Sequence, residues 1–127
     1  MIIFEMDIIY YEKEDGTIPV VEYIESLDNE KLKAKVLWEI DLLEKYGFDL
    51  KKPYVDSIKG KYYNKLYELR IMFSSNISRI FYFCTINKAF VLLSGYTKKS
   101  NKTDKKELDR AIEFMKDYIT RFGGKNE

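Results

Sequence analysis

Side chains that could act on a phosphate group are concentrated in the middle of the chain. Residues 51–102 contain eleven Lys and Arg residues but only two acidic ones, Asp56 and Glu68, whereas the whole chain has a formal charge of +1. Arginine holds phosphate oxygens through two parallel hydrogen bonds and stays charged at any relevant pH. A segment this positive therefore favours encounter with phosphate polyanions.

Four cations of this segment fall within or at the ends of predicted strands. Arg70 lies in the middle of one strand, Arg79 begins the next, and Lys98 and Lys99 follow a third. If these strands are neighbours, the four side chains converge on one face or rim of a sheet. Interleaved aromatic residues offer surfaces for stacking unpaired bases, namely Tyr62, Tyr63, Tyr67, Phe81, Tyr82 and Tyr96. The alternative is a solvated strand face in which Arg70 pairs with Glu68 and the aromatic residues form core.

The composition excludes several kinds of catalytic site. The chain has no histidine and a single cysteine, Cys84, so neither a Ser-His-Asp triad, a Cys-His dyad nor a zinc site of histidines or thiolates can be built. The glycines match no nucleotide-binding fingerprint. We therefore expect no metal and no cofactor, and we expect acid–base chemistry to depend on Lys, Tyr, Asp, Glu or water supported by Arg.

The elements that must position these residues are predicted to form one α+β domain over residues 1–127. The expected order is β-α-α-β-β-β-α, with a mainly antiparallel sheet packed against an N-terminal helical hairpin and a C-terminal helix. Asp28 is expected to cap the second helix, and Asp104 the last. Period-two alternation places Leu66, Glu68, Arg70 and Met72 on one strand face and Tyr67, Leu69, Ile71 and Phe73 on the other. The expected elements are strands at 2–10, 66–73, 79–84 and 90–96 and helices at 19–27, 28–47 and 104–122.

Targeting and membrane segments are not expected. Glu5 and Asp7 interrupt the apolar N-terminus, which therefore lacks the pattern of a signal peptide. No apolar run approaches the roughly 20 residues of a membrane helix. We therefore expect a cytoplasmic protein without membrane contact.

Three segments resemble a known family in both order and spacing. They are residues 66–70 (LYELR), 78–82 (SRIFY) and 92–103 (LLSGYTKKSNKT), with Glu107 and Ala111 beyond. Together they resemble the phage-derived, HigB-like branch of the RelE/ParE toxin superfamily, over about residues 60–115. This resemblance implies a RelE-like fold and a type II toxin, a metal-independent endoribonuclease that cuts messenger RNA on the ribosome. It also implies neutralisation by a small cognate antitoxin, a helix-turn-helix protein similar to HigA.

The resemblance and the residue types together suggest roles for individual side chains. Arg70 and Arg79 are expected to position the phosphate, and the candidates for general acid and base are Lys98, Lys99, Tyr96 and Glu68. A lysine can act as a base near neutral pH only if its pKa falls from about 10.4 to about 7, which costs roughly 4 to 5 kcal/mol. We expect six further lysines to hold the RNA, namely Lys51, Lys52, Lys59, Lys61, Lys65 and Lys102. Two other functions stay open: a non-catalytic RNA- or ribosome-binding phage module, and a gyrase-directed toxin of the same fold.

Overall fold

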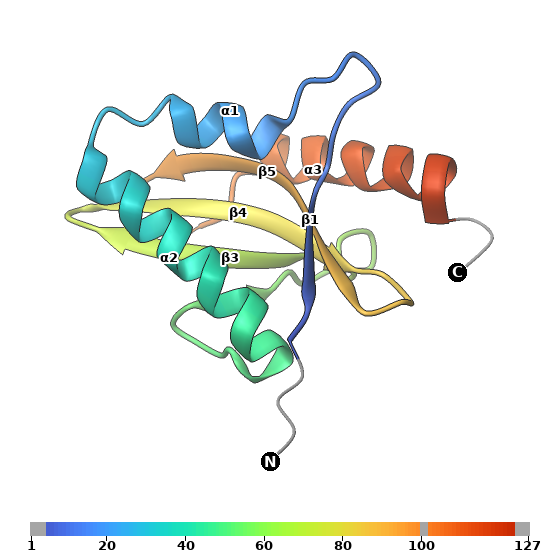
Figure 1. Cartoon of the computed structure of the whole chain (residues 1–127), viewed down its shortest axis with the longest axis horizontal. Helices are drawn as coiled ribbons and strands as arrows, with labels where there is room; N and C mark the ends of the chain where they lie inside the picture. The colour runs from blue at the N-terminus through green and yellow to red at the C-terminus, as the bar shows by residue number, and fades with distance from the viewer. Residues whose placement is uncertain (1–4, 100–101, 124–127) are drawn as a thin grey trace.

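The structure is a computed structural model that describes residues 5–99 and 102–123 of the chain (Figure 1). Its helices are α1 (Pro19–Glu25), α2 (Glu30–Tyr46) and α3 (Lys105–Tyr118), with a short 3-10 turn η1 (Gly47–Asp49) after α2 and a π turn η2 (Ile119–Gly123) after α3. Its strands are β1 (Asp7–Tyr10), β2 (Val55–Ser57), β3 (Tyr67–Phe73), β4 (Asn76–Cys84) and β5 (Ala89–Lys98).

All five strands form one sheet in the order β1-β5-β4-β3-β2. The pairs β2–β3, β3–β4 and β4–β5 are antiparallel, and β1 runs parallel to β5. The predicted α+β class with a mostly antiparallel sheet is therefore confirmed. The predicted element order was wrong at one place, because it lacks β2, whose three residues are too few to show a period-two pattern.

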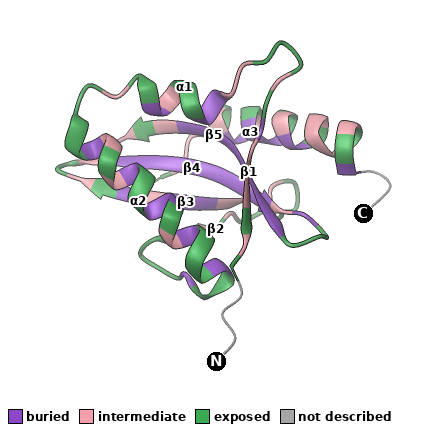
Figure 2. Cartoon of the chain, viewed as in Figure 1, coloured by how far each residue is buried: buried purple, intermediate pink, exposed green. Residues whose placement is uncertain are grey.

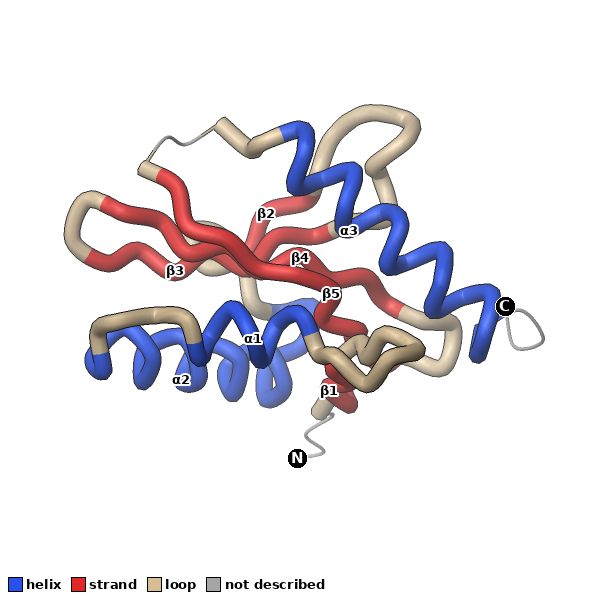
Figure 3. Tube along the Cα trace, turned by 90° about the horizontal axis from the view of Figure 1, so that it is seen from above, coloured by secondary structure: helices blue, strands red, loops and turns tan. Residues whose placement is uncertain are grey.

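The helices cover both faces of the sheet. Seen from above in Figure 3, α1 and α2 lie on one side and α3 lies on the other. The predicted alternation of β3 is confirmed: Leu69 and Ile71 pack in the core cluster that contains α1 and α2 residues, whereas Leu66 packs in the cluster that contains α3 residues. Glu68 and Arg70 therefore belong to the face that α3 covers.

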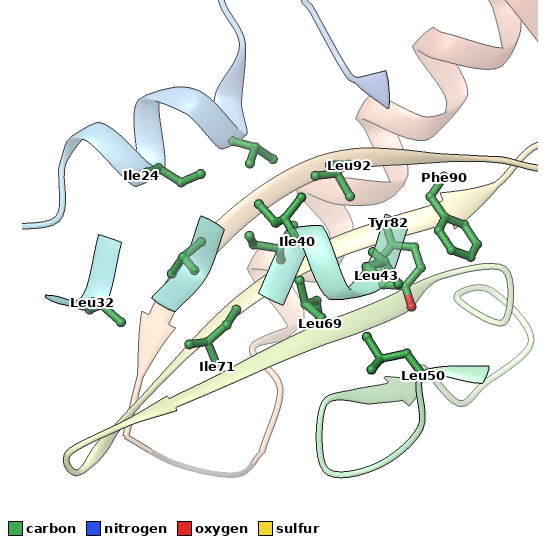
Figure 4. Close-up of a cluster of buried hydrophobic side chains, with 13 residues drawn as sticks. Ile24, Leu32, Ile40, Leu43, Leu50, Leu69, Ile71, Tyr82, Phe90 and Leu92 are labelled. Carbon is green, nitrogen blue, oxygen red and sulfur yellow. The ribbon is translucent and has the colours of Figure 1, made fainter. Parts of the chain in front are cut away.

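Burial is highest in the central strands, where β4 and β5 are mostly purple in Figure 2. The core between the sheet and the helical hairpin includes Leu43 of α2 and Tyr82 and Leu92 of the sheet, as Figure 4 shows. Because both faces of β4 are covered, nearly every one of its side chains is buried, including polar ones. A charged residue on this strand must therefore find its partner inside the protein.

Local capping defines where the helices begin and end. Asn29, not the predicted Asp28, caps α2, because its side-chain oxygen accepts hydrogen bonds from the backbone amides of Lys31 and Leu32 at 2.9 and 3.1 Å. Gly47 ends α2 with a φ of 54°, a value that favours glycine. Asp104 caps α3 as predicted, accepting from the amide of Lys106 at 2.9 Å. No helix within the described residues is long and apolar enough to cross a membrane.

Candidate functional site

Three of the predicted site residues lie in one row across the sheet. Arg70 of β3 pairs with Arg79 of β4, and Arg79 pairs with Tyr96 of β5. Directly paired residues of antiparallel strands project from the same face. The register therefore brings Arg70, Arg79 and Tyr96 together on the α3 face, and Glu68 lies one step along the same face of β3.

Glu68 lies between the two arginines. Its Oε1 is 2.7 Å from Nε of Arg79 and 3.6 Å from Nε of Arg70. Arg79 is fully buried and Glu68 is only 3% exposed, whereas the Arg70 side chain keeps 18% of its surface accessible. Arg70 can therefore reach a bound phosphate directly, while Arg79 lies beneath the surface and holds the carboxylate in place.

Burial shifts the protonation of the two central oxygen groups. The loss of hydration raises the pKa of Glu68 above its usual range, and the guanidinium groups of Arg79 and Arg70 oppose that shift. Burial likewise raises the pKa of the Tyr96 phenol, against the opposing effect of Arg79. Glu68 is consequently a stronger proton acceptor than an exposed carboxylate, and Tyr96 stays a neutral phenol at neutral pH.

The start of α3 closes over this cluster. The Thr103 hydroxyl donates to Oε2 of Glu68 at 3.1 Å, and the backbone amide of Asp104 donates to the Tyr96 hydroxyl at 2.9 Å. Nη1 of Arg79 donates to the same hydroxyl at 3.4 Å. Residues 103 and 104 therefore lie against Glu68 and Tyr96 at the start of α3.

The two predicted lysines at the end of β5 differ in position. Lys98 pairs with Ile77, two residues from Arg79, so it belongs to the same face, and its Nζ is 3.7 Å from Oδ2 of Asp104. Lys99 follows the strand and is exposed. The structure therefore brings Lys98 beside Arg79 and Tyr96, and leaves Lys99 outside the row.

A support on the opposite face was missed by sequence reasoning. The Tyr23 hydroxyl of α1 donates to the Ser78 hydroxyl at 2.7 Å and lies 2.5 Å from that of Thr97. These two residues are neighbours of Arg79 and Lys98 in sequence. Gly95 makes room for the ring, because a Cβ there would lie 2.6 Å from a Tyr23 ring carbon. The available signal was a glycine inside a strand, which often marks a close approach.

The remaining basic residues do not converge with this row. Lys59, Lys61 and Lys65 are exposed in the β2–β3 connection, and Lys102 is exposed before α3. Lys88 lies in the β4–β5 turn, at the opposite end of the sheet from Lys98. The basic segment is thus divided among several surfaces. Across residues 5–99 and 102–123, no group of three or more Cys, Asp or Glu side chains is arranged to hold a metal ion.

Comparison with known proteins adds one match. Residues 22–116, which include every element from the end of α1 to most of α3, match the model of the family described as phage-derived protein Gp49-like (DUF891). That family is part of the RelE/ParE-like toxin superfamily. No curated protein matches the chain.

Proposed function

Because the chain belongs to the Gp49-like family of phage-derived proteins, within the RelE/ParE-like toxin superfamily, we propose that it is the toxin of a type II toxin–antitoxin system and that it cleaves messenger RNA on the ribosome. The observation that carries this proposal is the Glu68 carboxylate held between two guanidinium groups, beside Tyr96 and Lys98. Such a cluster combines proton acceptors, proton donors and cations in a chain without histidine.

The proposed reaction is attack by a ribose 2′-hydroxyl on the adjacent phosphorus. The base removes the hydroxyl proton, the 2′-oxygen–phosphorus bond forms, the phosphorus–5′-oxygen bond breaks, and the leaving 5′-oxygen takes a proton. The products are a 2′,3′-cyclic phosphate and a free 5′-hydroxyl. Cations near the phosphate stabilise the negative charge that develops on its oxygens.

The positions of the side chains suggest a division of roles. Glu68 is the proposed base, because burial raises its pKa and makes it a better proton acceptor. Arg70 and Lys98 are the proposed phosphate contacts, since both keep exposed surface on the α3 face. Arg79 is a positioning residue that holds Glu68 and Tyr96. Tyr96 and Lys98 are the candidates for donating a proton to the leaving oxygen.

This proposal includes a change of conformation at residues 103 and 104. In the free protein the Thr103 hydroxyl donates a hydrogen bond to Oε2 of Glu68. We propose that docking on the ribosome breaks this contact, which would make cleavage of free RNA slow. The same contact favours one alternative, a module that binds RNA or ribosomes without cutting. If Thr103 stays on Glu68, the buried Arg79 and Glu68 only stabilise the fold and take no part in a reaction.

The partner implied by a toxin family is an antitoxin. We propose that it is a small helix-turn-helix protein similar to HigA. A short reading frame of that kind beside the gene, whose product abolishes toxicity on co-expression, would support this partner.

The test is translation in a cell-free extract with intact ribosomes, followed by mapping of RNA 5′ ends. The wild-type protein should stop translation and produce new 5′ ends within the message. Arg70→Ala should weaken both effects at least about tenfold, a loss of about 1.4 kcal/mol in transition-state stabilisation. Lys88→Ala, at the other end of the sheet, is the matched control. Inhibition with uncut message would overturn the nuclease and favour the binding module, and DNA damage with intact transcripts would favour a gyrase-directed toxin.

A further inference from the structure

A cleft separate from the candidate site lies at the β2 edge of the sheet. Its volume is about 570 Å³, and its lining includes Phe48, Tyr67, Tyr82, Lys51 and Lys52. Tyr82 belongs to the core cluster on the α1 and α2 side, where Figure 4 shows it near Leu50, another residue of the lining. The cleft therefore opens on the face of the sheet opposite to the row of Arg70, Arg79 and Tyr96.

Three aromatic rings, Phe48, Tyr67 and Tyr82, line this cleft. Tyr67 stacks on Tyr82 with ring centroids 5.4 Å apart and an interplanar angle of 21°. Phe48 meets Tyr67 edge-on at 6.4 Å and is 50% exposed. Phe48 also meets Phe90 edge-on, with ring centroids 5.1 Å apart. A half-exposed phenylalanine ring held by Tyr67 and Phe90 is a ready surface for a flat ligand, because stacking there costs little ordering of the protein.

Charged and hydrogen-bonding groups surround the rings. Lys51 and Lys52 are exposed residues of the lining, and Asp56 is its acidic residue, with Oδ1 3.6 Å from Nζ of Lys52. The lining also includes Val55 to Ser57 of β2, an edge strand that pairs with β3 alone within the described sheet. Its outer backbone groups can therefore bond to the edge of a base, while the lysines attract a phosphate.

We propose that this cleft binds one unpaired nucleotide of an RNA strand, with the base stacked on Phe48 and the phosphate at Lys51 and Lys52. The volume lies within the range of about 300 to 1,000 Å³ usual for small-molecule sites. A purely apolar ligand would leave the lysines without a role, and a free anion would leave the rings without one. The choice of RNA as the ligand rests on the proposed function.

The lysines beyond β2 connect this cleft with the other face. Lys59, Lys61 and Lys65 follow in the β2–β3 connection, whose Tyr62 and Tyr63 side chains contact Lys116 and Asp109 of α3. The connection thus runs from the β2 edge to the helix that covers Arg79. An RNA strand anchored in the cleft would meet this basic segment on its way to the α3 face.

The test is binding of a fluorescently labelled single-stranded oligoribonucleotide, measured by anisotropy without ribosomes. Phe48→Leu keeps the apolar volume but removes the ring, and should weaken binding at least about fivefold, whereas Phe48→Trp should preserve it. Trp38→Leu is the matched control, since Trp38 is also half-exposed but lies on α2 outside the cleft. The double variant Lys51→Ala, Lys52→Ala should weaken binding and flatten its salt dependence.

Each outcome separates the cleft from the nuclease. Equal affinities of wild type and Phe48→Leu, with the message still cut on ribosomes, would overturn the cleft and leave the nuclease standing. Loss of RNA binding in Phe48→Leu, with no cleavage by the wild type, would support the cleft and overturn the nuclease. Binding of a nucleoside monophosphate to the wild type, with no measurable binding of the oligoribonucleotide, would identify a free nucleotide as the ligand and overturn the assignment to an RNA strand.

Discussion

At the scale of single residues, the molecule depends on a charge cluster inside the sheet. Arg79 is fully buried and its Nε lies 2.7 Å from Glu68. Taking two charges out of water costs free energy that only their mutual attraction and further hydrogen bonds offset. Thr103 and Tyr96 supply such bonds. Removal of either Arg79 or Glu68 should therefore destabilise the fold, because it leaves the other charge buried without its partner.

The first prediction concerns Arg79. Arg79→Ala should lower the free energy of unfolding by about 3 to 5 kcal/mol, because Glu68 would be left as a buried charge without its closest partner. Urea denaturation followed by circular dichroism measures this loss. Adding Glu68→Gln to Arg79→Ala should recover part of it. An Arg79→Ala protein as stable as wild type would contradict the buried pair.

The second prediction compares the two adjacent lysines. Lys98→Ala should lower single-turnover cleavage on ribosomes at least about tenfold, because Lys98 shares the face of Arg79 and lies near Tyr96. Lys99→Ala should change it far less. Both side chains lie at the end of β5, so neither substitution should alter the urea midpoint by much. Equal losses from the two variants would show that charge at this edge matters more than its position.

At the scale of elements, α1 supports the strands β4 and β5, which carry part of the candidate site. The Tyr23 hydroxyl bonds to Ser78 and lies within bonding distance of Thr97, and its ring lies against Gly95. This contact fixes α1 against β4 and β5 from the face opposite to Arg79. On the other face of the sheet, the hydrogen bond from the Thr103 hydroxyl to Glu68 fixes the start of α3 against β3.

The third prediction concerns Gly95. Gly95→Ala should destabilise the protein by about 1 to 3 kcal/mol, because the new Cβ would lie 2.6 Å from the Tyr23 ring and force it to move. The urea midpoint measures the effect. The same substitution in a Tyr23→Ala background should cost almost nothing. An equal loss of stability in both backgrounds would mean that the new Cβ does not clash with the Tyr23 ring.

At the scale of the whole molecule, helices enclose both faces of one sheet, and they also bury a carboxylate of α2, on the face opposite to the candidate site. Glu39 of α2 is only 1% exposed, and its Oε2 has no hydrogen-bond partner among the described residues. Loss of hydration raises the pKa of Glu39 to about 7, and Lys35 opposes the shift. The folded state therefore holds a proton on Glu39 that the unfolded state releases near pH 4.5.

The fourth prediction concerns the pH dependence of stability. Because the folded state binds this proton more tightly, the contribution of Glu39 to stability falls as pH rises from about 4.5 to about 7 and is constant above that. The free energy of unfolding of wild type should therefore fall between pH 4 and pH 8 by up to about 3 kcal/mol more than that of Glu39→Gln. Urea denaturation of both proteins across this range measures the difference. If the free energies of unfolding of the two proteins change with pH in parallel, the pKa of Glu39 is not raised by folding.

Local patterns in the sequence were sufficient for much of the fold. Alternation along β3 correctly separated Leu69 from Glu68 and Arg70, because successive strand residues point to opposite faces whatever lies around them. Asp104 was correctly identified as a helix cap, since capping depends on the residues that follow directly. The same local reasoning failed at Asp28, where the neighbouring Asn29 supplies the cap.

By itself the sequence determined the residue types of the candidate site and the face of β3 that carries Glu68 and Arg70. Only the tertiary structure decided that Arg70, Arg79 and Tyr96 share one row, that Arg79 is buried against Glu68, and that β1 joins the sheet parallel to β5. The register of the strands and their order in the sheet depend on contacts between segments far apart in the chain. Those contacts must cover both faces of the sheet at once. No periodicity within one strand contains that information.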